Sequence, residues 1–439
     1  MKHVDTIIRA RWIIPVEPLN TVLEHHSLII DQGKITDIVD NKSAEHDYQS
    51  NDIVDLNQHV LIPGLVNAHT HAAMNLFRGI ADDLPLMTWL NDHIWPAEQQ
   101  WVDYTFVKDG SLHAIAEMLR GGTTCFNDMY FYPDATADAA ISAGIRCRIG
   151  LIALDFPTVW AKDADDYLSK GLAIHDQFKN EPLISTALAP HAPYTVSDEP
   201  LTKIQTYADE LDIPVHMHVH ETADEVKQAV DNNGERPLAR LNKLGLLTPK
   251  LLAVHMTQLT DDEITLCAQQ GVNIIHCPES NLKLASGFCP SAKLIEAGIN
   301  MAIGTDGAAS NNDLNMFGEM RTAALIAKGI AQDASVMPAA KALHCATMGG
   351  AKAMGMEQQI GSLEVGKAAD ITAIDLNNLE SQPIFNPLSH TVYCVDRSQV
   401  SDVWVNGKRL LNQRCLTTID VNSVKEKAQT WQRAITENK

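Results

Sequence analysis

Two histidines separated by a single residue form the first candidate site for chemistry. The segment Asn67-Ala68-His69-Thr70-His71 directly follows the strand-like run VLIPG. Side chains alternate along a strand, so both imidazoles are expected to point the same way. Neutral imidazole is a preferred zinc ligand. The pair therefore predicts part of a metal site, although such a pair by itself is as consistent with incidental spacing.

A second histidine cluster lies on and just after the predicted strand Val215–Val219. Residues 215–222 read VHMHVHET, so three histidines alternate and share one face. We expect only one of them to complete the metal shell and assign that role to His218. Glu221 follows it by three residues and reaches over the metal if the strand ends near His218. His216 is expected deeper in the fold and His220 beside the site, both in packing or supporting roles.

Two further strand ends carry a single chemically active residue each. His255 follows Leu251–Val254, and Asp306 follows Asn300–Ile303 within the sequence GTDG. Alone, a histidine at a strand end is often a core residue, and such an aspartate is often a turn or helix cap. Together with the earlier histidines they predict three imidazoles and one carboxylate around a zinc ion with room for water. Glu221 and Asp306 are then the candidate proton carriers.

The middle of the chain alternates short apolar runs with amphipathic helical patterns. This alternation predicts an α/β fold, a (β/α)8 TIM-like barrel over residues 61–358, with the motifs at the carboxyl ends of its strands. A doubly wound open sheet is the alternative, but no G-x-G-x-x-G or Walker loop supports it. The expected strands are Val60–Ile62, Thr123–Asn127, Cys147–Leu154, Leu183–Leu188, Val215–Val219, Leu251–His255, Val272–His276 and Asn300–Ile303. The expected helices include Phe106–Arg120, Thr136–Ala143, Leu201–Leu211 and Asp261–Gln270.

Both ends of the chain are rich in short strand patterns. Residues 1–60 and 359–439 are therefore predicted to form one small β-sandwich domain, with two separate end subdomains as the alternative. Asp31-Gln32-Gly33 and Asn406-Gly407 are the expected turns. The expected strands are Thr6–Ile8, Ser27–Ile30, Lys34–Val39, Asp370–Asp375 and Asp402–Val405.

Composition narrows the class of partner. The chain has 439 residues, a formal net charge of −21 and only 5% aromatic residues. Such acidity disfavours nucleic acid and anionic membranes as partners, so a small molecule is expected. Arg9 and Arg11 interrupt the first apolar run, and no run is long enough to span a membrane. Eight cysteines without a C-x-x-C motif indicate free thiols in a reducing cytoplasm.

Taken together, these motifs resemble the amidohydrolase superfamily, and most closely its branch that deaminates 5′-methylthioadenosine and S-adenosylhomocysteine. The resemblance covers nearly the whole chain, and the metal motif is its most specific part. Besides HTH, HVHET, His255 and GTDGAASNN, it rests on longer stretches. These are PGLVNAHTHAAMNLFRGIADDLPLMTWL (63–90), APHAPYTVS (189–197), SNLKLASG (280–287), GTDGAASNNDLNMFGEMR (304–321) and IGSLEVGKAADITAID (360–375).

The resemblance implies a role for each residue of the predicted centre. One zinc ion per subunit would be held by His69, His71, His218 and Asp306. Glu221 would protonate a purine ring nitrogen, and His255 would hold the attacking water. Asp306 would also carry the proton to the leaving amine.

The resemblance also implies substrate contacts. Glu98 would accept hydrogen bonds from the ribose hydroxyls, and His191 would contact the ribose or nearby atoms. Trp89, with Leu84, Leu86 and Met87, would wall the 5′ group, unless these four residues form an ordinary helix core face. Relatives carry an arginine near the end of the third strand, where this chain has Gly150-Leu151. Arg148 is the remaining candidate for that contact.

The activity implied is zinc-dependent hydrolytic deamination of the adenine ring of 5′-methylthioadenosine and S-adenosylhomocysteine, with adenosine as a further candidate. A cytoplasmic homo-oligomer acting on a nucleoside is expected. A related amidohydrolase acting on guanine or on an amino- or chlorotriazine is the alternative, and a catalytically silent metal-binding scaffold is a third reading. The sequence lacks the H-x-E and P-C-x-x-C motifs of another zinc deaminase class. No lysine lies in Leu183–Leu188 to bridge two metals, which favours one.

Overall fold

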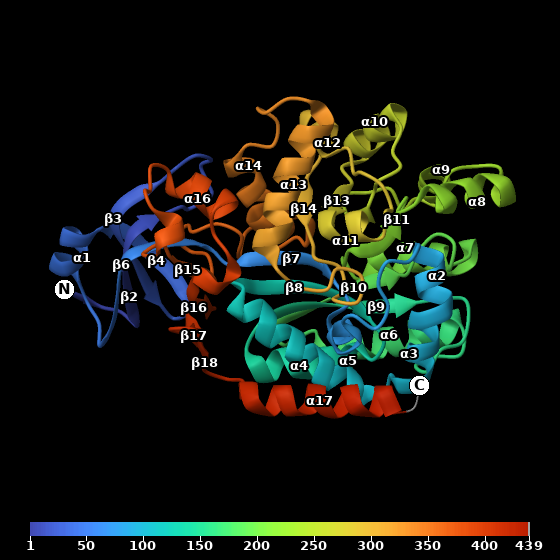
Figure 1. Ribbon diagram of the computed structural model, residues 1–439, viewed down its shortest axis with the longest axis horizontal. Coiled ribbons are helices and arrows are strands. Elements are labelled where there is room, and N and C mark those ends of the chain that lie inside the picture. Colours follow the sequence, from blue (N-terminus) through green and yellow to red (C-terminus); the bar gives the residue numbers. More distant parts are fainter. Residues whose placement is uncertain (438–439) are drawn as a thin grey trace. The chain divides into compact units, whose positions relative to one another are not determined.

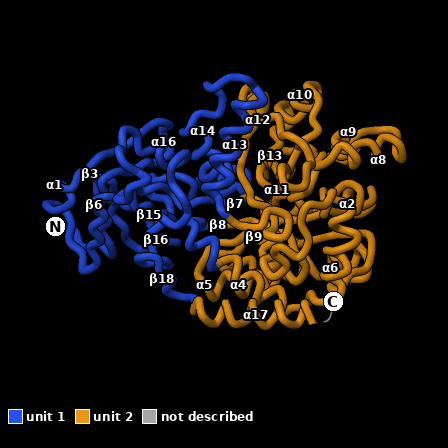
Figure 2. The backbone as a smooth tube through the Cα atoms, in the orientation of Figure 1, with its two compact units in different colours: residues 1–67, 116–125, 315–419 blue, residues 68–115, 126–314, 420–439 orange. Residues whose placement is uncertain are grey.

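The computed structural model describes residues 1–437 and divides them into two compact units (Figure 2). The first unit comprises residues 1–67, 116–125 and 315–419. The second comprises residues 68–115, 126–314 and 420–437. Among the described residues, no helix is both long enough and apolar enough to cross a lipid bilayer.

Eight parallel strands among the described residues form the barrel (Figure 1), with neighbours in the sheet following chain order. The expected (β/α)8 architecture is confirmed. The strands are β7 (Leu65–Thr70), β8 (Thr123–Tyr130), β9 (Arg146–Ala153), β10 (Ile184–Pro190), β11 (Val215–Val219), β12 (Leu251–His255), β13 (Asn273–His276) and β14 (Met301–Ile303). The chain after β14 returns to β7, because the Asp306 amide donates to the His69 carbonyl at 3.0 Å.

The first predicted barrel strand, Val60–Ile62, is wrong. These residues end β6 (Asp52–Pro63), which pairs with β15 (Ile371–Asp375) in a different sheet. The apolar run has no polar break, so periodicity cannot show where one strand ends and the next begins. Gly64 separates them, and a Cβ there would lie 2.0 Å from Thr124 Oγ1. The His-x-His motif therefore lies on and just after β7.

Helices cover the barrel and agree with the expected pattern. In α10, the Thr260 hydroxyl accepts from the Glu263 amide while the Glu263 carboxylate accepts from the Thr260 amide, a reciprocal cap that fixes the helix start. The helices of the barrel region are α2 (Leu86–Trp89), α3 (Trp95–Trp101), α4 (Tyr104–Arg120), α5 (Pro133–Ala143), α6 (Ala164–Phe178), α7 (Asp198–Glu210), α8 (Ala223–Asn233), α9 (Pro237–Lys243), α10 (Asp261–Gln270), α11 (Pro278–Lys283) and α12 (Ser291–Glu296).

The C-terminal helix, α17 (Val421–Glu437), belongs to the second unit and runs beside α4 (Figure 1). Asp109 accepts hydrogen bonds from Lys427 at 2.6 Å and from the Trp431 indole at 3.2 Å. The Trp431 ring also meets Phe106 edge-on, with centroids 5.1 Å apart. The first unit holds α1 (Asn41–Asp47), α13 (Met316–Ala331), α14 (Ala339–His344), α15 (Gly350–Ala353) and α16 (Pro387–Tyr393).

Strands from both chain ends join in one mixed sheet of the first unit, in the order β18-β17-β16-β15-β6-β2-β3-β4. The antiparallel pairing of β6 with β15 connects the two ends. Both expected turns are present: Gln32 and Gly33 have φ of 51° and 76°, and Asn406 and Gly407 have φ of 48° and 76°. The remaining strands are β2 (Thr6–Ile13), β3 (Leu23–Asp31), β4 (Lys34–Asp40), β16 (Val400–Val405), β17 (Lys408–Asn412) and β18 (Cys415–Leu416).

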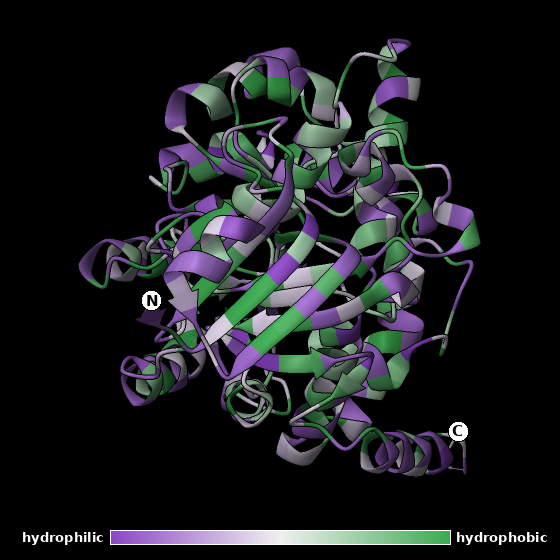
Figure 3. Cartoon of the chain, turned by 90° about the vertical axis from the view of Figure 1, so that its left-hand side faces the viewer, coloured by the Kyte–Doolittle hydropathy of each residue, from purple (hydrophilic) through white to green (hydrophobic). Residues whose placement is uncertain are grey.

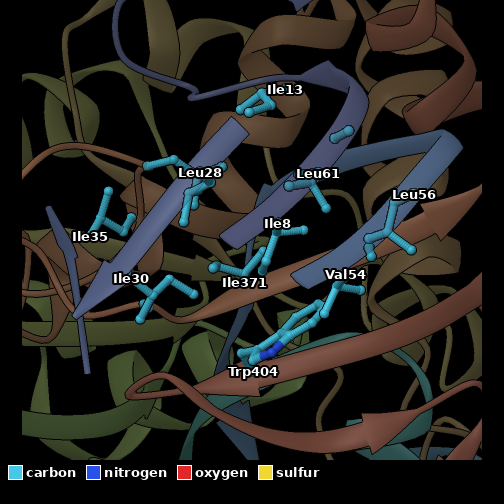
Figure 4. Packing of buried hydrophobic residues seen from close by; sticks show 14 residues of the cluster. Ile8, Ile13, Leu28, Ile30, Ile35, Val54, Leu56, Leu61, Ile371 and Trp404 are labelled. Atoms are coloured by element: carbon cyan, nitrogen blue, oxygen red, sulfur yellow. The ribbon is translucent and has the colours of Figure 1, made fainter. Parts of the chain in front are cut away.

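One buried apolar cluster underlies this mixed sheet. Ile8, Leu28, Leu61 and Ile371 are fully buried, and Trp404 is 1% exposed (Figure 4). The strands nearest the viewer in Figure 3 carry hydrophobic and hydrophilic residues in bands. Such alternation is what a strand with one packed face requires. The strands that hold the site have a different pattern, because all residues of β7, β8, β9, β11 and β12 are buried.

Candidate active site

The barrel brings the predicted metal-binding residues to the carboxyl ends of three strands. His69 lies on β7, His71 immediately follows it, and His218 lies on β11. Asp306 follows β14 and is 5% exposed, while His69 is fully buried. Residues far apart in sequence converge because parallel barrel strands present their carboxyl ends to one face.

The donor atoms of these side chains are spaced as ligands of one metal ion. His69 Nε2 lies 3.2 Å from His218 Nε2 and 3.3 Å from Asp306 Oδ1. His71 Nε2 lies 3.2 Å from the same Asp306 oxygen. Two ligands held about 2.0–2.1 Å from a tetrahedral zinc are roughly 3.3 Å apart. These three distances match that spacing, and His69 is the residue that links His218 to the pair formed by His71 and Asp306.

Backbone carbonyls orient two of the imidazoles. His71 Nδ1 donates to the Met129 carbonyl at 2.5 Å, and His218 Nδ1 donates to the His191 carbonyl at 2.7 Å. A carbonyl can only accept, so the proton of each neutral ring sits on Nδ1. The lone pair is then on Nε2, which faces the other donors.

The remaining histidines of the VHMHVHET segment lie outside the donor cluster. His216 is fully buried behind His69, and its Nε2 lies 2.8 Å from His69 Nδ1. His220 is also buried, but its Nε2 accepts from the Leu238 amide at 3.3 Å. The structure thus places His216 beneath the centre and His220 to its side.

Asp306 is held by contacts on both carboxylate oxygens. Its Oδ2 accepts from Ser280 at 2.6 Å, and its Oδ1 accepts from the Gly307 amide at 2.8 Å. Burial favours the neutral acid, but the neighbouring His69 and His71 side chains outweigh it and hold the pKa of Asp306 well below its usual range. Its φ is 61°, a strained conformation for a side chain of this kind. The carboxylate is therefore ionised and fixed toward the histidines.

Glu221 and His255 lie above the donor cluster. Glu221 Oε2 is 3.8 Å from His255 Nε2, and Ser286 Oγ is 3.5 Å from Glu221 Oε1. His255 Nδ1 donates to Asn281 Oδ1 at 2.8 Å, which turns its Nε2 into the site. Burial raises the pKa of Glu221. A buried carboxyl with a raised pKa holds its proton more tightly and is suited to donate it to a bound substrate.

The side chain of Glu225 holds the turn that carries Glu221. Glu225 accepts the backbone N–H of His220 at 3.1 Å and that of Glu221 at 2.7 Å. The Thr222 hydroxyl caps α8 by accepting from the Glu225 amide at 3.1 Å. The strand therefore ends near His218, as expected, and the chain turns Glu221 back over the site.

A cavity of about 560 Å³ opens onto the donor cluster and contains the predicted substrate-binding residues. Glu98, on α3, lines it, and burial raises the pKa of that carboxyl to about 7. His191 lines it directly after β10, with Nδ1 3.1 Å from Thr195 Oγ1, and burial lowers the pKa of this imidazole to about 3. A cavity of this size suits a small organic substrate.

Of the four residues expected to wall the 5′ group, two line the cavity and two do not. Trp89 and Leu86 line the cavity, and the Trp89 indole donates to the Ala81 carbonyl at 3.2 Å. Met87 is 36% exposed, and neither it nor Leu84 lines the cavity.

Arg148 is not brought to this cavity. It lies early on β9, is 7% exposed, and its Nε donates to Ser185 Oγ at 3.0 Å. Residues near the start of a barrel strand lie away from the carboxyl end where the cavity opens.

Sequence reasoning gave no role to Ser280 and Asn281, which contact Asp306 and His255. Both lie at the start of α11, in the SNLKLASG stretch. That stretch contributed only to the resemblance, because serine and asparagine near a helix start usually satisfy backbone groups. The sequence could not indicate the Met129 carbonyl as a partner of His71 either, because every residue has a backbone carbonyl.

Two overlapping groups of side chains among the described residues offer metal donors within 4.8 Å of one another. One contains His69, His218 and His255, and the other contains His69, His71 and Asp306. Nitrogen and carboxylate donors in this number suit zinc. His255 thus lies close to two of the four expected ligands, His69 and His218.

Comparison with known proteins places the chain among enzymes. A model of the amidohydrolase family matches residues 60–410. A protein named 5-methylthioadenosine/S-adenosylhomocysteine deaminase from Saccharophagus degradans is 51% identical over 428 residues, which cover 98% of this chain and 96% of that protein. A protein of the same name from Teredinibacter turnerae is 48% identical, with 98% of each chain covered.

A solved structure also matches throughout. An adenosine deaminase from Xanthomonas campestris with bound zinc superposes with a TM-score of 0.98. It is 50% identical in sequence, and the match covers 99% of each chain. Its zinc agrees with the spacing of the imidazole and carboxylate donors described above.

Proposed function

The chain belongs to the amidohydrolase family, and on that premise we propose that it is a zinc-dependent deaminase of 5′-substituted adenosines. The names of its relatives point to 5′-methylthioadenosine and S-adenosylhomocysteine, with adenosine as a third substrate. One observation carries the proposal: four metal donors and an acidic side chain converge at the base of a cavity large enough for a nucleoside.

We assign the metal to His69, His71, His218 and Asp306. When bound, zinc supplies Lewis acidity and lowers the pKa of a coordinated water to about 7. The carbonyl contacts of His71 and His218 fix the proton of Nδ1 and so leave Nε2 as the atom of each ring that can bind the metal. Ser280 holds the second oxygen of Asp306 and so fixes the direction of the first.

Glu221 is the proposed proton donor to the adenine ring. Burial raises the pKa of this carboxyl, which favours its protonated form. Transfer of that proton to N1 makes C6 electrophilic, so that water oxygen can bond to C6. The turn held by Glu225 keeps this carboxyl above the metal donors.

Asp306 is proposed to transfer the proton of the attacking water, and His255 is proposed to orient that water. Asp306 is ionised, so it can take a proton from the attacking water and deliver it to the exocyclic nitrogen. His255, oriented by Asn281, directs Nε2 at the same water and steadies the oxygen as the C6–N bond breaks. The products are ammonia and the inosine analogue. The oxygen of water remains on C6, and the exocyclic amine leaves as ammonia after gaining one hydrogen.

The substrate is proposed to enter with its base toward the metal donors and its ribose at Glu98. An ionised Glu98 accepts hydrogen bonds from two ribose hydroxyls, and His191 contacts the ribose from the other wall. Trp89 and Leu86 cover the cavity and exclude bulk water.

The decisive experiment is a substrate panel with purified, metal-analysed protein. Adenosine and 5′-methylthioadenosine should show the ultraviolet change from adenine to hypoxanthine and release one ammonia each. Guanine and a chlorotriazine serve as the rival substrates. Turnover of either rival without turnover of any adenosine would contradict the proposal.

We also propose that the enzyme acts in the cytoplasm as a homo-oligomer. Six of the eight cysteines are buried and all eight are free, which suits a reducing compartment. Light scattering on the purified protein would report the oligomeric state.

A further inference from the structure

The substrate cavity contains acidic side chains but no lysine or arginine among its described lining residues. Glu98, Glu221 and Asp306 line it. Its histidines are His71, His191, His218 and His255. Away from the metal donors, an anionic group on a ligand would therefore meet no lysine or arginine side chain among the described lining residues.

Apolar side chains line the cavity near Glu98, together with Gln99 and Tyr130. Leu90 and Ile94 precede Glu98 by eight and four residues in the same helical run, and both line the cavity. On the far wall stand Phe156 and Val159. The two walls approach each other, because the Trp95 and Phe156 rings have centroids 6.3 Å apart.

Two lysines near the cavity walls in sequence have partners elsewhere. Lys283 Nζ bonds Asp82 at 2.5 Å and Asn312 at 2.7 Å. Lys170 Nζ donates to the Trp160 carbonyl at 2.6 Å. Arg148, the candidate suggested by the sequence, is outside the lining.

We propose that this apolar end of the cavity selects uncharged 5′-thioether substituents, including alkyl groups longer than methyl, and disfavours the amino acid tail of S-adenosylhomocysteine. The inference rests on the proposed function, since the ribose at Glu98 directs the 5′ group to these walls. A carboxylate buried there gains no ion pair, and desolvation then opposes binding. An alkyl chain instead gains from burial against the same side chains.

A matched pair of substrates tests this. Butylthioadenosine, with the butylthio group at the 5′ carbon, and S-adenosylhomocysteine both carry a sulfur followed by four carbons in the substituent, but only the second is charged. For wild-type enzyme, kcat/KM should be at least about tenfold higher for the butylthio compound. Equal values, or a preference for S-adenosylhomocysteine, would overturn the inference.

The same panel separates this inference from the proposed function. If adenosine and 5′-methylthioadenosine are not deaminated, the proposed function fails. If they are deaminated and the charged and uncharged thioethers react equally well, only the specificity inference fails.

A cation introduced at the wall provides a second test. Val159 is half-buried, so Val159→Arg can direct a guanidinium into the cavity from its rim. The ratio of kcat/KM for S-adenosylhomocysteine to that for the butylthio compound should rise at least about fivefold, because the carboxylate gains a partner. Val159→Met is the matched control for size and should leave this ratio within about twofold.

Phe156→Arg gives an independent variant at a more exposed position, since Phe156 is 39% exposed. It should shift the ratio in the same direction. Zinc content and melting temperature verify that each variant is folded. An unchanged ratio in a folded arginine variant at either position would count against the proposed wall.

Discussion

His69 Nε2 lies 3.3 Å from Asp306 Oδ1, although β7 and the segment after β14 are the first and last parts of the barrel. The same two residues are joined through the backbone, because the Asp306 amide donates to the His69 carbonyl. Closure of the barrel and assembly of the metal centre are therefore one structural event. A change that opens this seam should affect fold and metal together.

Asp306→Ala is expected to lose most bound zinc and to lower kcat/KM by at least about 10³-fold, because the variant removes a ligand and a proton carrier. Ser280→Ala removes only the contact that orients the carboxylate. It should weaken zinc binding by about 10–100-fold. Metal content after dialysis against a graded chelator measures both effects. Full zinc retention in Asp306→Ala would refute the ligand assignment.

Glu221→Gln should keep its zinc but lower kcat by about 10²–10⁴-fold, because the amide cannot give a proton to N1. Ser286→Ala is the matched control. It removes only a long 3.5 Å contact to the same carboxyl and should change kcat by less than about fivefold. Steady-state kinetics with metal analysis distinguishes the two. Wild-type turnover in zinc-loaded Glu221→Gln would rule out the proposed acid.

Nucleoside affinity should weaken as the pH falls through 7. The pKa of Glu98 is raised to about 7 by burial, so the ionised form that accepts two hydroxyl protons is lost below that pH. KM for adenosine should rise up to about tenfold between pH 8 and pH 6. In Glu98→Gln, KM should be higher throughout and nearly independent of pH. A flat wild-type KM over this range would remove Glu98 from the ribose site.

The contact of Lys283 with Asp82 ties the segment before α2 to α11 at 2.5 Å, and Asn312 also contacts Asp82. That segment leads into the cavity wall at Leu86. Lys283→Met should therefore raise KM by a few fold, and Asp82→Asn should do the same.

A double-mutant cycle tests whether these two residues act together. Because the pair is partly exposed, its coupling should be only about 0.2–1 kcal/mol and should shrink in high salt. Independent, additive effects on KM would show that the ion pair does not hold the wall.

Gly304→Ala should destabilise the protein and weaken zinc binding. A Cβ at this position would lie 2.7 Å from the His69 backbone nitrogen, so β7 must move. The loss of stability should be about 1–3 kcal/mol.

Gly329→Ala is the control for adding a methyl group. Gly329 is exposed on α13, and a Cβ there meets nothing within 4 Å. It should stabilise the helix by about 0.5–1 kcal/mol without changing zinc binding. Thermal unfolding with and without chelator compares the two variants, and equal stability would contradict the close approach at residue 304.

The sequence by itself determined the elements and the chemical types. Alternating apolar runs predicted the barrel, and β11 and β12 begin and end where their patterns indicate. Local alternation also put His69 and His71 on one face. Signals of this kind depend only on neighbours along the chain, so they can be read without the fold.

Tertiary structure decided which of those residues meet. It moved the start of the barrel from Val60–Ile62 to β7, placed His216 beneath His69, and kept Arg148 away from the cavity. It also brought Ser280 and Asn281 of α11 into contact with Asp306, after β14, and His255, on β12. The position of a side chain along the barrel axis depends on the register between strands and on how the barrel closes. Both are set by pairings between segments that are distant in sequence. Those pairings leave no periodic trace in the sequence, which is why the structure was needed to decide them.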